Sequence, residues 1–261
     1  MDTANCTQAE IARCVDRVLQ SRRSTRAYRP DPLPAETVLE ILDAAATAPS
    51  NSNTQPWRVH VLAGAALREL GDALVASFRE GSLPPSPHFP DPLPPEFGER
   101  QADFATRYYG CLGIDRHDAD ARSGQTEKNF HFFGAPVGLL FSIDRRLTAH
   151  SWLDVGLFVQ NVMIAAGARG IATCPQVSFA RFHPVIASRL GMSPDHLTAC
   201  GMSMGFAETA AAVNQVRMPR QGAREFAQFV GFEPAPPARA ATVLSPQTVS
   251  DPHVDSPRAA K

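Results

Sequence analysis

The sequence lacks the short motifs that mark the commonest nucleotide-binding and zinc-peptidase sites. Neither GxGxxG nor the phosphate-loop pattern GxxxxGKS/T is present, which argues against a Rossmann or a P-loop nucleotide site. HExxH is also absent, and the eight histidines show no metal-ligand spacing. We therefore expect no metal ion and treat the histidines as structural or surface residues.

An excess of either charge is also missing. The formal net charge is −1 and the isoelectric point about 6.7, so the charge favours neither nucleic acid nor an anionic membrane as a partner. The longest nearly uncharged run, residues 155–168, is too short to span a bilayer. The opening stretch MDTANCTQAE has an early acid and no apolar core, so we expect no secretory signal.

The sequence contains few cysteines, and their spacing forms no paired motif. The five cysteines form no CxxC pair, and their odd number favours free thiols in a reducing compartment over a disulfide framework. Together with the missing signal and membrane span, this predicts a soluble, cytoplasmic protein.

What is present is the composition of an ordinary globular protein: 261 residues, 44% hydrophobic and 20% charged. We expect one domain over residues 1–232. Residues 233–261 are rich in Pro, Ala and Ser and poor in large apolar side chains, which predicts a disordered tail. Residues 81–98 are so rich in proline that they predict an irregular excursion rather than a helix or a central strand.

Apolar periodicity predicts helices interspersed with strands. Thr7 and Glu10 fit a capping box at the start of a helix that ends near residue 21. Further helices are predicted over residues 34–45, 66–78, 104–112, 151–169 and 184–190. Strands are predicted over residues 58–62, 137–143, 170–174 and 199–206. The helix at 151–169 is apolar nearly all round, so it belongs in a core or a subunit interface.

Three polar sets are candidates for function. The first, Arg22-Arg23-Ser24-Thr25-Arg26, places three guanidinium groups within five residues at the end of a helix. Guanidinium groups bind phosphate oxygens through bidentate, charge-assisted hydrogen bonds, so this set suits a phosphate. Taken alone, a solvated basic turn that complements the helix C-terminus explains the set better.

The second set is APSNSNTQPW at residues 48–57, whose amides on Asn51, Asn53 and Gln55 both donate and accept hydrogen bonds. Such amides suit the edge of a flat heterocycle, and an Asx-type turn is the alternative. The third set is Arg217 and Arg220 in VNQVRMPR. Taken alone, this set indicates a charged surface loop.

In this order along the chain, the sets resemble the FMN-dependent nitroreductase family, in particular its nitroaromatic and nitrobenzoate reductase branch. The resemblance implies an α+β fold, in which helices surround a mostly antiparallel sheet, and an intertwined homodimer with two FMN sites at the subunit interface. It covers residues 17–232 and rests on RRSTRAY, ILDAAATAPSNSNTQPW, NFHFFGAPVGLLF, GIATCPQ, CGMSMGFA and VNQVRMPR.

The resemblance also implies which residues bind FMN, in three groups. Those expected to hold the phosphate and the ribityl chain are Arg22, Arg23, Ser24, Arg26, Arg217 and Arg220. Those expected to reach the flavin from the partner subunit are Pro49, Ser50, Asn51, Asn53 and Gln55. Those expected beside N5 and O4 of the ring are Pro175 and Gln176.

The implied activity is reduction of a small nitroaromatic or quinone-like acceptor by NADH or NADPH. Two electrons would pass through flavin N5 in a ping-pong sequence, with no catalytic side chain. Tyr108 and Phe130 are candidates for the acceptor pocket because flat nitroaromatics stack on aromatic rings, although core packing explains both equally well. Arg107 and Arg116 are candidates to pair with a substrate carboxylate.

Other reactions occur on the same fold, because fold does not fix reaction. The alternatives are a flavin or enone reductase, a dehalogenase and an oxygen-dependent enzyme that fragments FMN. A flavin-binding protein without turnover is an alternative from a different class.

Overall fold

The computed structural model describes residues 6–81 and 92–232. Its contacts divide the chain into a first compact unit, Met1–Met218, and a second, Pro219–Lys261. The helix α9 (Ala223–Phe226) belongs to the second unit. The single domain over residues 1–232 stays a prediction, and the predicted tail at 233–261 lies outside the described residues.

The first unit is built on one antiparallel sheet. The strands are β1 (Trp57–Ala63), β2 (Val137–Asp144), β3 (Ala172–Gln176) and β4 (His196–Gly205), in the order β1-β2-β4-β3, and each neighbouring pair is antiparallel. The α+β fold with an antiparallel sheet is therefore confirmed. Along β2 every residue from Val137 to Ile143 is buried, because helices cover both faces of the sheet.

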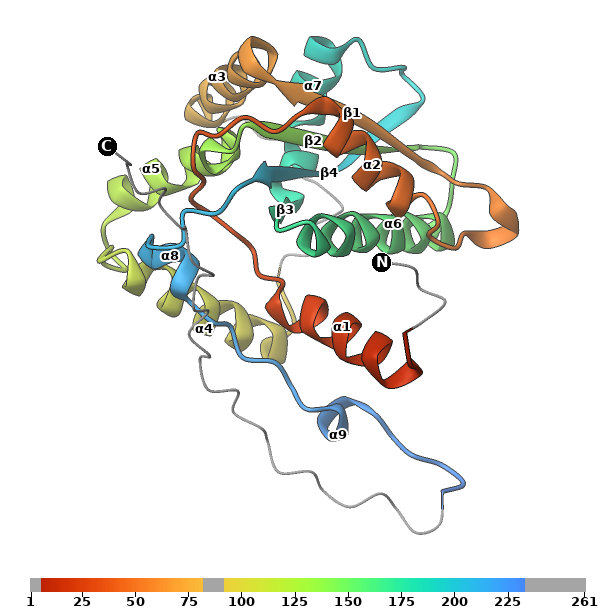
Figure 1. Ribbon diagram of the computed structural model, residues 1–261. Coiled ribbons are helices and arrows are strands. Elements are labelled where there is room, and N and C mark those ends of the chain that lie inside the picture. The colour runs from red at the N-terminus through yellow and green to blue at the C-terminus, as the bar shows by residue number, and fades with distance from the viewer. Residues whose placement is uncertain (1–5, 82–91, 233–261) are drawn as a thin grey trace, which may run out of the picture. The chain divides into compact units, whose positions relative to one another are not determined.

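Helices α2 (Ala35–Ala45) and α6 (Ala149–Ala168) cover one face of the sheet (Figure 1). Their side chains form a core with alternate residues of β2, and the ring of Phe158 stacks on Trp57 with centroids 4.7 Å apart. The helix predicted over residues 34–45 is confirmed, and its residues Val38, Ile41 and Ala45 are buried against the sheet and α6.

The opposite face is covered by α3 (Gly64–Glu80), α5 (Ala119–Phe130) and α7 (His183–Leu190), with the 3₁₀ turn η4 (Val177–Phe182) (Figure 1). The rings of Phe130, Phe179 and Phe182 meet there at centroid distances of 4.6–6.0 Å. Phe130 is therefore a core residue, and its candidacy for the acceptor pocket was wrong.

Helix α6 meets, by length and composition, the criterion for a membrane-crossing helix, and it is the one such helix among the described residues. Its 20 residues exceed the uncharged run at 155–168 because the helix also takes in Asp154. Eight of its side chains are buried, and packing against the sheet and α2 accounts for its apolar composition. Leu153 and Leu157 remain exposed on its other side.

Helix α1 (Gln8–Ser21) begins with the predicted capping box. The Thr7 side chain accepts from the Glu10 N–H at 3.3 Å, and the Glu10 carboxylate accepts from the Thr7 N–H at 2.8 Å. The apolar stripe of α1 is exposed within this chain, at Ile11, Val15 and Leu19.

Two elements differ from the sequence prediction. Helix α4 (Pro95–Cys111) begins inside the segment predicted to be irregular up to residue 98, because proline is tolerated in the first turn of a helix. Residues 82–91 of that segment lie outside the described residues. Helix α5 was not predicted, because its buried side chains are only Gln125 and Phe130 and give no apolar period. The short helices are η2 (Asn51–Asn53), η3 (Phe132–Gly134) and α8 (Ala212–Gln215).

Two partly buried histidines make the stability of this fold depend on pH. Burial lowers the pKa of His60 and of His183, and the charges of His196 and Arg145 act in the same direction. Below the histidine pKa of the unfolded chain, about 6.5, the unfolded chain therefore binds more protons than the folded one. The free energy of unfolding is then highest above this pH and decreases as the pH falls below it.

We predict that the free energy of unfolding, measured with urea, is lower at pH 5.5 than at pH 7.5. The double variant His60→Gln, His183→Gln should reduce this difference, whereas exposed His117→Gln should leave it intact. An equal difference in the double variant would show that other groups govern the pH dependence.

Candidate functional site

The arginine-rich turn that follows α1, residues 22–26, is attached to the edge strand of the sheet. Ser24 forms a parallel bridge with Thr173 of β3, and the Thr25 N–H donates to the Thr173 carbonyl at 3.1 Å. Because the backbone of the turn is fixed along β3, its side chains project from a rigid segment.

One buried amide fastens this turn from its other side. Asn214 of α8 accepts from the Arg26 N–H through Oδ1 at 2.8 Å, and its Nδ2 donates to the carbonyls of Ala27 and Glu208, each at 2.8 Å. The backbone carbonyl of Asn214 also accepts from the Arg23 guanidinium at 3.1 Å. Asn214 thus joins the arginine turn to the segment after β4.

Arg23 and Arg26 of the turn, together with Arg217, carry positive charge that no described carboxylate neutralises. Burial lowers the pKa of Arg23, and the positive charge of Arg217 lowers it further. Among residues 6–81 and 92–232, no acidic side chain forms an ion pair with Arg23, Arg26 or Arg217. Such a cluster suits an anion with several oxygen acceptors.

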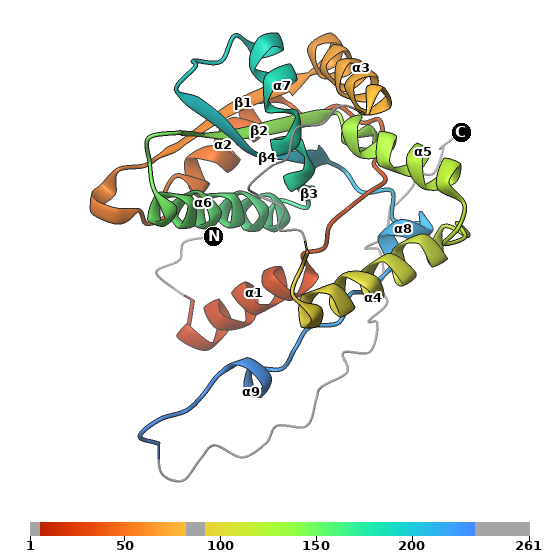
Figure 2. The ribbon, with the colours of Figure 1, turned by 180° about the vertical axis from the view of Figure 1, so that it is seen from behind.

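Helix α4 supplies aromatic rings beside the turn. The guanidinium carbon of Arg26 lies 4.9 Å from the centroid of the Tyr108 ring and 5.5 Å from that of Phe104. The Tyr108 hydroxyl accepts from Gln125 Nε2 of α5 at 2.7 Å, and Tyr108 is largely buried. Seen from behind in Figure 2, α4 lies beside α8, which carries Asn214.

The end of β3 presents a second polar feature. Gln176 is 3% exposed, and its Nε2 donates to the backbone carbonyl of Asn129 at 2.6 Å and to Asn129 Oδ1 at 3.2 Å. Its Oε1 is buried and has no hydrogen-bond partner among the described residues. Pro175, next to it, is exposed.

Residues 49–55 form a tight turn between α2 and β1. Ser52, Asn53 and Gln55 have φ between +47° and +57°, a left-handed conformation that non-glycine residues seldom adopt and that clusters at functional sites. The Ser50 hydroxyl accepts from the Gln55 N–H at 3.0 Å, so part of the set serves the turn itself. The exposed side-chain amides of Asn51 and Asn53 bond to no described residue.

Within a single chain, the 49–55 turn lies far from the arginine turn. The Asn51 N–H donates to the Asp154 carboxylate in the first turns of α6 at 3.2 Å, whereas Val18 of α1 lies beside Gly167 in its last turn. At 1.5 Å per residue, these two points on α6 are about 20 Å apart. Figure 1 shows the two segments towards opposite ends of α6.

Other predicted residues are placed as follows. Arg220 belongs to the second unit, where its guanidinium contacts the Pro219 carbonyl at 2.9 Å, and its role stays a prediction. Arg107 pairs with Asp103 one turn earlier on α4 at 2.8 Å, so its charge is already neutralised and it is a poor partner for a substrate carboxylate. Arg116 stays a prediction.

Residues 201–205 spell GMSMG, which matches the GxSxG pattern of nucleophile elbows. The structure excludes that role. Ser203 is fully buried within β4 rather than on a strand-to-helix turn, and its hydroxyl pairs with the Tyr28 hydroxyl at 3.0 Å. Within the described ranges, no three His, Cys, Asp or Glu side chains gather as metal ligands would.

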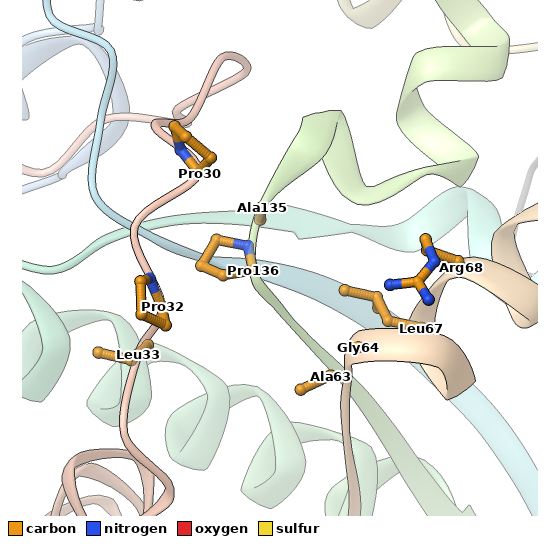
Figure 3. Close-up of a pocket in the computed structure, with 9 residues that line it drawn as sticks. All are labelled: Pro30, Pro32, Leu33, Ala63, Gly64, Leu67, Arg68, Ala135 and Pro136. Carbon is orange, nitrogen blue, oxygen red and sulfur yellow. The ribbon is translucent and has the colours of Figure 1, made fainter.

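An open cavity of about 320 Å³ lies elsewhere, where the chain enters α2 and α3 (Figure 3). It is mostly apolar, and the exposed Arg68 lies at its edge. No predicted site residue contributes to it. Its lining residues are Pro30, Pro32, Leu33, Ala63, Gly64, Leu67, Arg68, Ala135 and Pro136.

Comparison with known proteins identifies the family. The model of the nitroreductase family matches residues 19–206, which include the arginine turn, the 49–55 turn and the sheet. This chain belongs to the nitroreductase family.

Two curated nitroreductases match the chain over nearly their whole length. A 4-nitrobenzoate reductase of Pseudomonas putida is 46% identical over 84% of this chain and 96% of its own length. A chloronitrobenzene nitroreductase of Comamonas testosteroni is 40% identical over 83% and 96% of the respective chains. The FMN-dependent nitroreductase NfnB of Mycobacterium smegmatis, solved in complex with NADPH, superposes with a TM-score of 0.81 at 37% identity, covering 84% of this chain and 99% of that one.

Two residues of this nitroreductase were not predicted to matter. Asn214 lies within the VNQVRMPR stretch, but its side-chain partners are up to 188 positions away, so no local pattern marks it as a clamp. Asn129 opens the NFHFFG stretch, and its contact with Gln176 spans 47 positions. The stretches that carry the family resemblance are the signal that could have drawn attention to both.

We predict that Asn214→Ala lowers the free energy of unfolding by about 3 kcal/mol, because it leaves one N–H and two carbonyls of the arginine turn and its neighbour without partners. Urea unfolding measures this loss. The adjacent, exposed Gln215→Ala, which removes a contact to the Thr209 carbonyl, should change stability by no more than about 0.5 kcal/mol. Equal effects of the two substitutions would refute the clamp.

Proposed function

We propose that this nitroreductase binds FMN and reduces nitroaromatic acceptors with NADH or NADPH. The relatives named above reduce 4-nitrobenzoate and chloronitrobenzene, and the superposed structure is an FMN-dependent enzyme in complex with NADPH. The observation in this chain that carries the proposal is the cluster of guanidinium groups without a carboxylate partner.

The arginine turn fits the phosphate end of FMN. Arg23, Arg26 and Arg217 offer guanidinium groups without a described carboxylate partner, and a phosphate dianion would neutralise their charge. Arg22 and Ser24 belong to the same turn and are proposed to share the phosphate and the ribityl chain.

The end of β3 fits the ring of FMN. A buried acceptor without a partner is costly, and Gln176 Oε1 is such an atom. An N–H of the flavin ring would satisfy it. Exposed Pro175 beside it offers an apolar surface on which a flat ring can rest.

When bound, FMN would supply the redox chemistry, which is two-electron transfer from the nicotinamide to the acceptor in the proposed ping-pong order. The protein side chains bind, orient and polarise, and none is needed as a nucleophile. If Arg26 also reaches the N1 side of the ring, its positive charge would favour the negative charge of the reduced cofactor. Tyr108, whose ring faces Arg26, is proposed to contribute to the acceptor site.

We propose further that the enzyme is a homodimer whose FMN sites are shared. The 49–55 turn lies about 20 Å along α6 from the arginine turn, so a second chain is the simplest source of Asn51 and Asn53 at the ring. Exposed apolar residues offer the surface that a dimer would bury, and they are Leu153, Leu157, Ile11, Val15 and Leu19.

A cytoplasmic location is proposed from the cysteines. All five are free thiols, and Cys6 and Cys14 are exposed. Exposed free thiols persist in a reducing compartment.

The activity is tested with purified protein under anaerobic conditions. We predict that bound FMN is bleached by NADH or NADPH and recovers its yellow colour on addition of 4-nitrobenzoate or nitrobenzene. Flavin that bleaches but recovers only with quinones or enones would point to a different reductase. Flavin that is destroyed in air would point to FMN fragmentation, and flavin that never bleaches would point to a binding protein.

The shared site is tested by complementation between two damaged chains. We predict that Asn53→Ala and the double variant Arg22→Gln, Arg23→Gln each retain less FMN than the wild type after dialysis. In mixed dimers purified after co-expression of the two variants, FMN should be restored to about half of the sites, because one site of each mixed dimer draws all of its residues from undamaged segments. No restoration in purified mixed dimers would contradict the shared site.

A further inference from the structure

Gln176 is held by a chain of hydrogen bonds that begins on η4. The Asn129 Nδ2 donates to the Ser178 hydroxyl at 2.8 Å, and Asn129 offers both its backbone carbonyl and its Oδ1 to Gln176 Nε2, at 2.6 and 3.2 Å. The chain therefore joins the last turn of α5, the end of β3 and η4.

These contacts leave one orientation for the Gln176 amide. Both groups that Asn129 presents are acceptors, so they must face the NH₂ end of the amide. Rotating the amide by 180° would set Oε1 against two oxygens and lose both hydrogen bonds. The orientation of Asn129 follows, because its Oδ1 must face the Gln176 NH₂, and its own NH₂ then donates to the Ser178 hydroxyl.

The consequence is a buried acceptor aimed away from Asn129. Gln176 is 3% exposed, and no described group donates to its Oε1. A buried amide oxygen left without a donor costs free energy, so its position calls for a ligand that carries an N–H.

We infer that Asn129 is a positioning residue, which holds Gln176 Oε1 as the acceptor for the N–H that FMN gains at N5 on reduction. The inference rests on the proposed function, since it requires that FMN binds. Oxidised flavin has no hydrogen at N5, so this hydrogen bond exists only in the reduced state. It therefore stabilises reduced FMN relative to oxidised FMN and raises the midpoint potential.

The test is the midpoint potential of the FMN-loaded protein, measured with reference dyes. Gln176→Leu should weaken binding of reduced relative to oxidised FMN about tenfold, which lowers the potential by about 30 mV for a two-electron couple. Asn129→Leu should shift the potential in the same direction by less, because the Asn129 backbone carbonyl still holds Gln176. The double variant should match Gln176→Leu, because Asn129 acts only through Gln176.

Two controls separate positioning from general damage. Gln125→Leu removes a buried amide contact on the same helix α5 and should leave the potential unchanged. Urea unfolding of the FMN-free variants measures the general damage separately, because Gln176→Leu also removes the two hydrogen bonds that Nε2 donates to Asn129 and should lower the free energy of unfolding. If Asn129→Leu fails to fold, Ser178→Ala releases the same chain and should lower the potential in its place.

Unchanged potentials in Gln176→Leu and in the Asn129 or Ser178 variant would overturn the inference. Additive shifts in the double variant would overturn the positioning role of Asn129. A wild-type protein that does not bind FMN in titration would instead refute the proposed function, so the two failures are distinguishable.

Discussion

The site depends on one constraint, which is the positive charge of Arg23, Arg26 and Arg217 that no described carboxylate neutralises. The positive charge of Arg217 lowers the pKa of Arg23. The fold bears this cost because the turn is fixed along β3 and clamped by the Asn214 amide. The proposed anion site would therefore be formed before any ligand arrives, which is the preorganisation that favours tight binding.

Helix α6 sets the second constraint. It packs on the sheet with one side, leaves Leu153 and Leu157 exposed on the other, and separates the two groups of predicted FMN ligands along its length. A symmetric pair of such chains would cover the exposed residues and bring complementary ends together. Stability and cofactor binding would then depend on the same interface.

Local patterns in the sequence predicted much of the fold. The capping box of Thr7 and Glu10, the apolar run of β2 and the all-round apolar α6 were readable because each signal lies within one element. Helix α5 was missed because its buried face consists of one glutamine and one phenylalanine, and β3 was placed two residues too early.

The site was predictable only in part. The arginine turn and the 49–55 turn stand out as polar clusters, and the family resemblance assigned them to FMN. The hydrogen bonds of Asn214 to the arginine turn and the orientation of Gln176 by Asn129 depend on contacts between segments that are distant in the sequence. Local sequence patterns do not reveal such contacts. Phe130 illustrates the reverse error, because an aromatic residue suited to a pocket in the sequence packs in the core.

The central claim, that the arginine turn is built for the phosphate of FMN, is tested most directly by comparing FMN with riboflavin. The two ligands share the same ring and differ by the phosphate alone. We expect riboflavin to bind the purified protein at least about 100-fold more weakly than FMN, a difference of about 2.7 kcal/mol. Equal affinities for the two ligands would contradict the account.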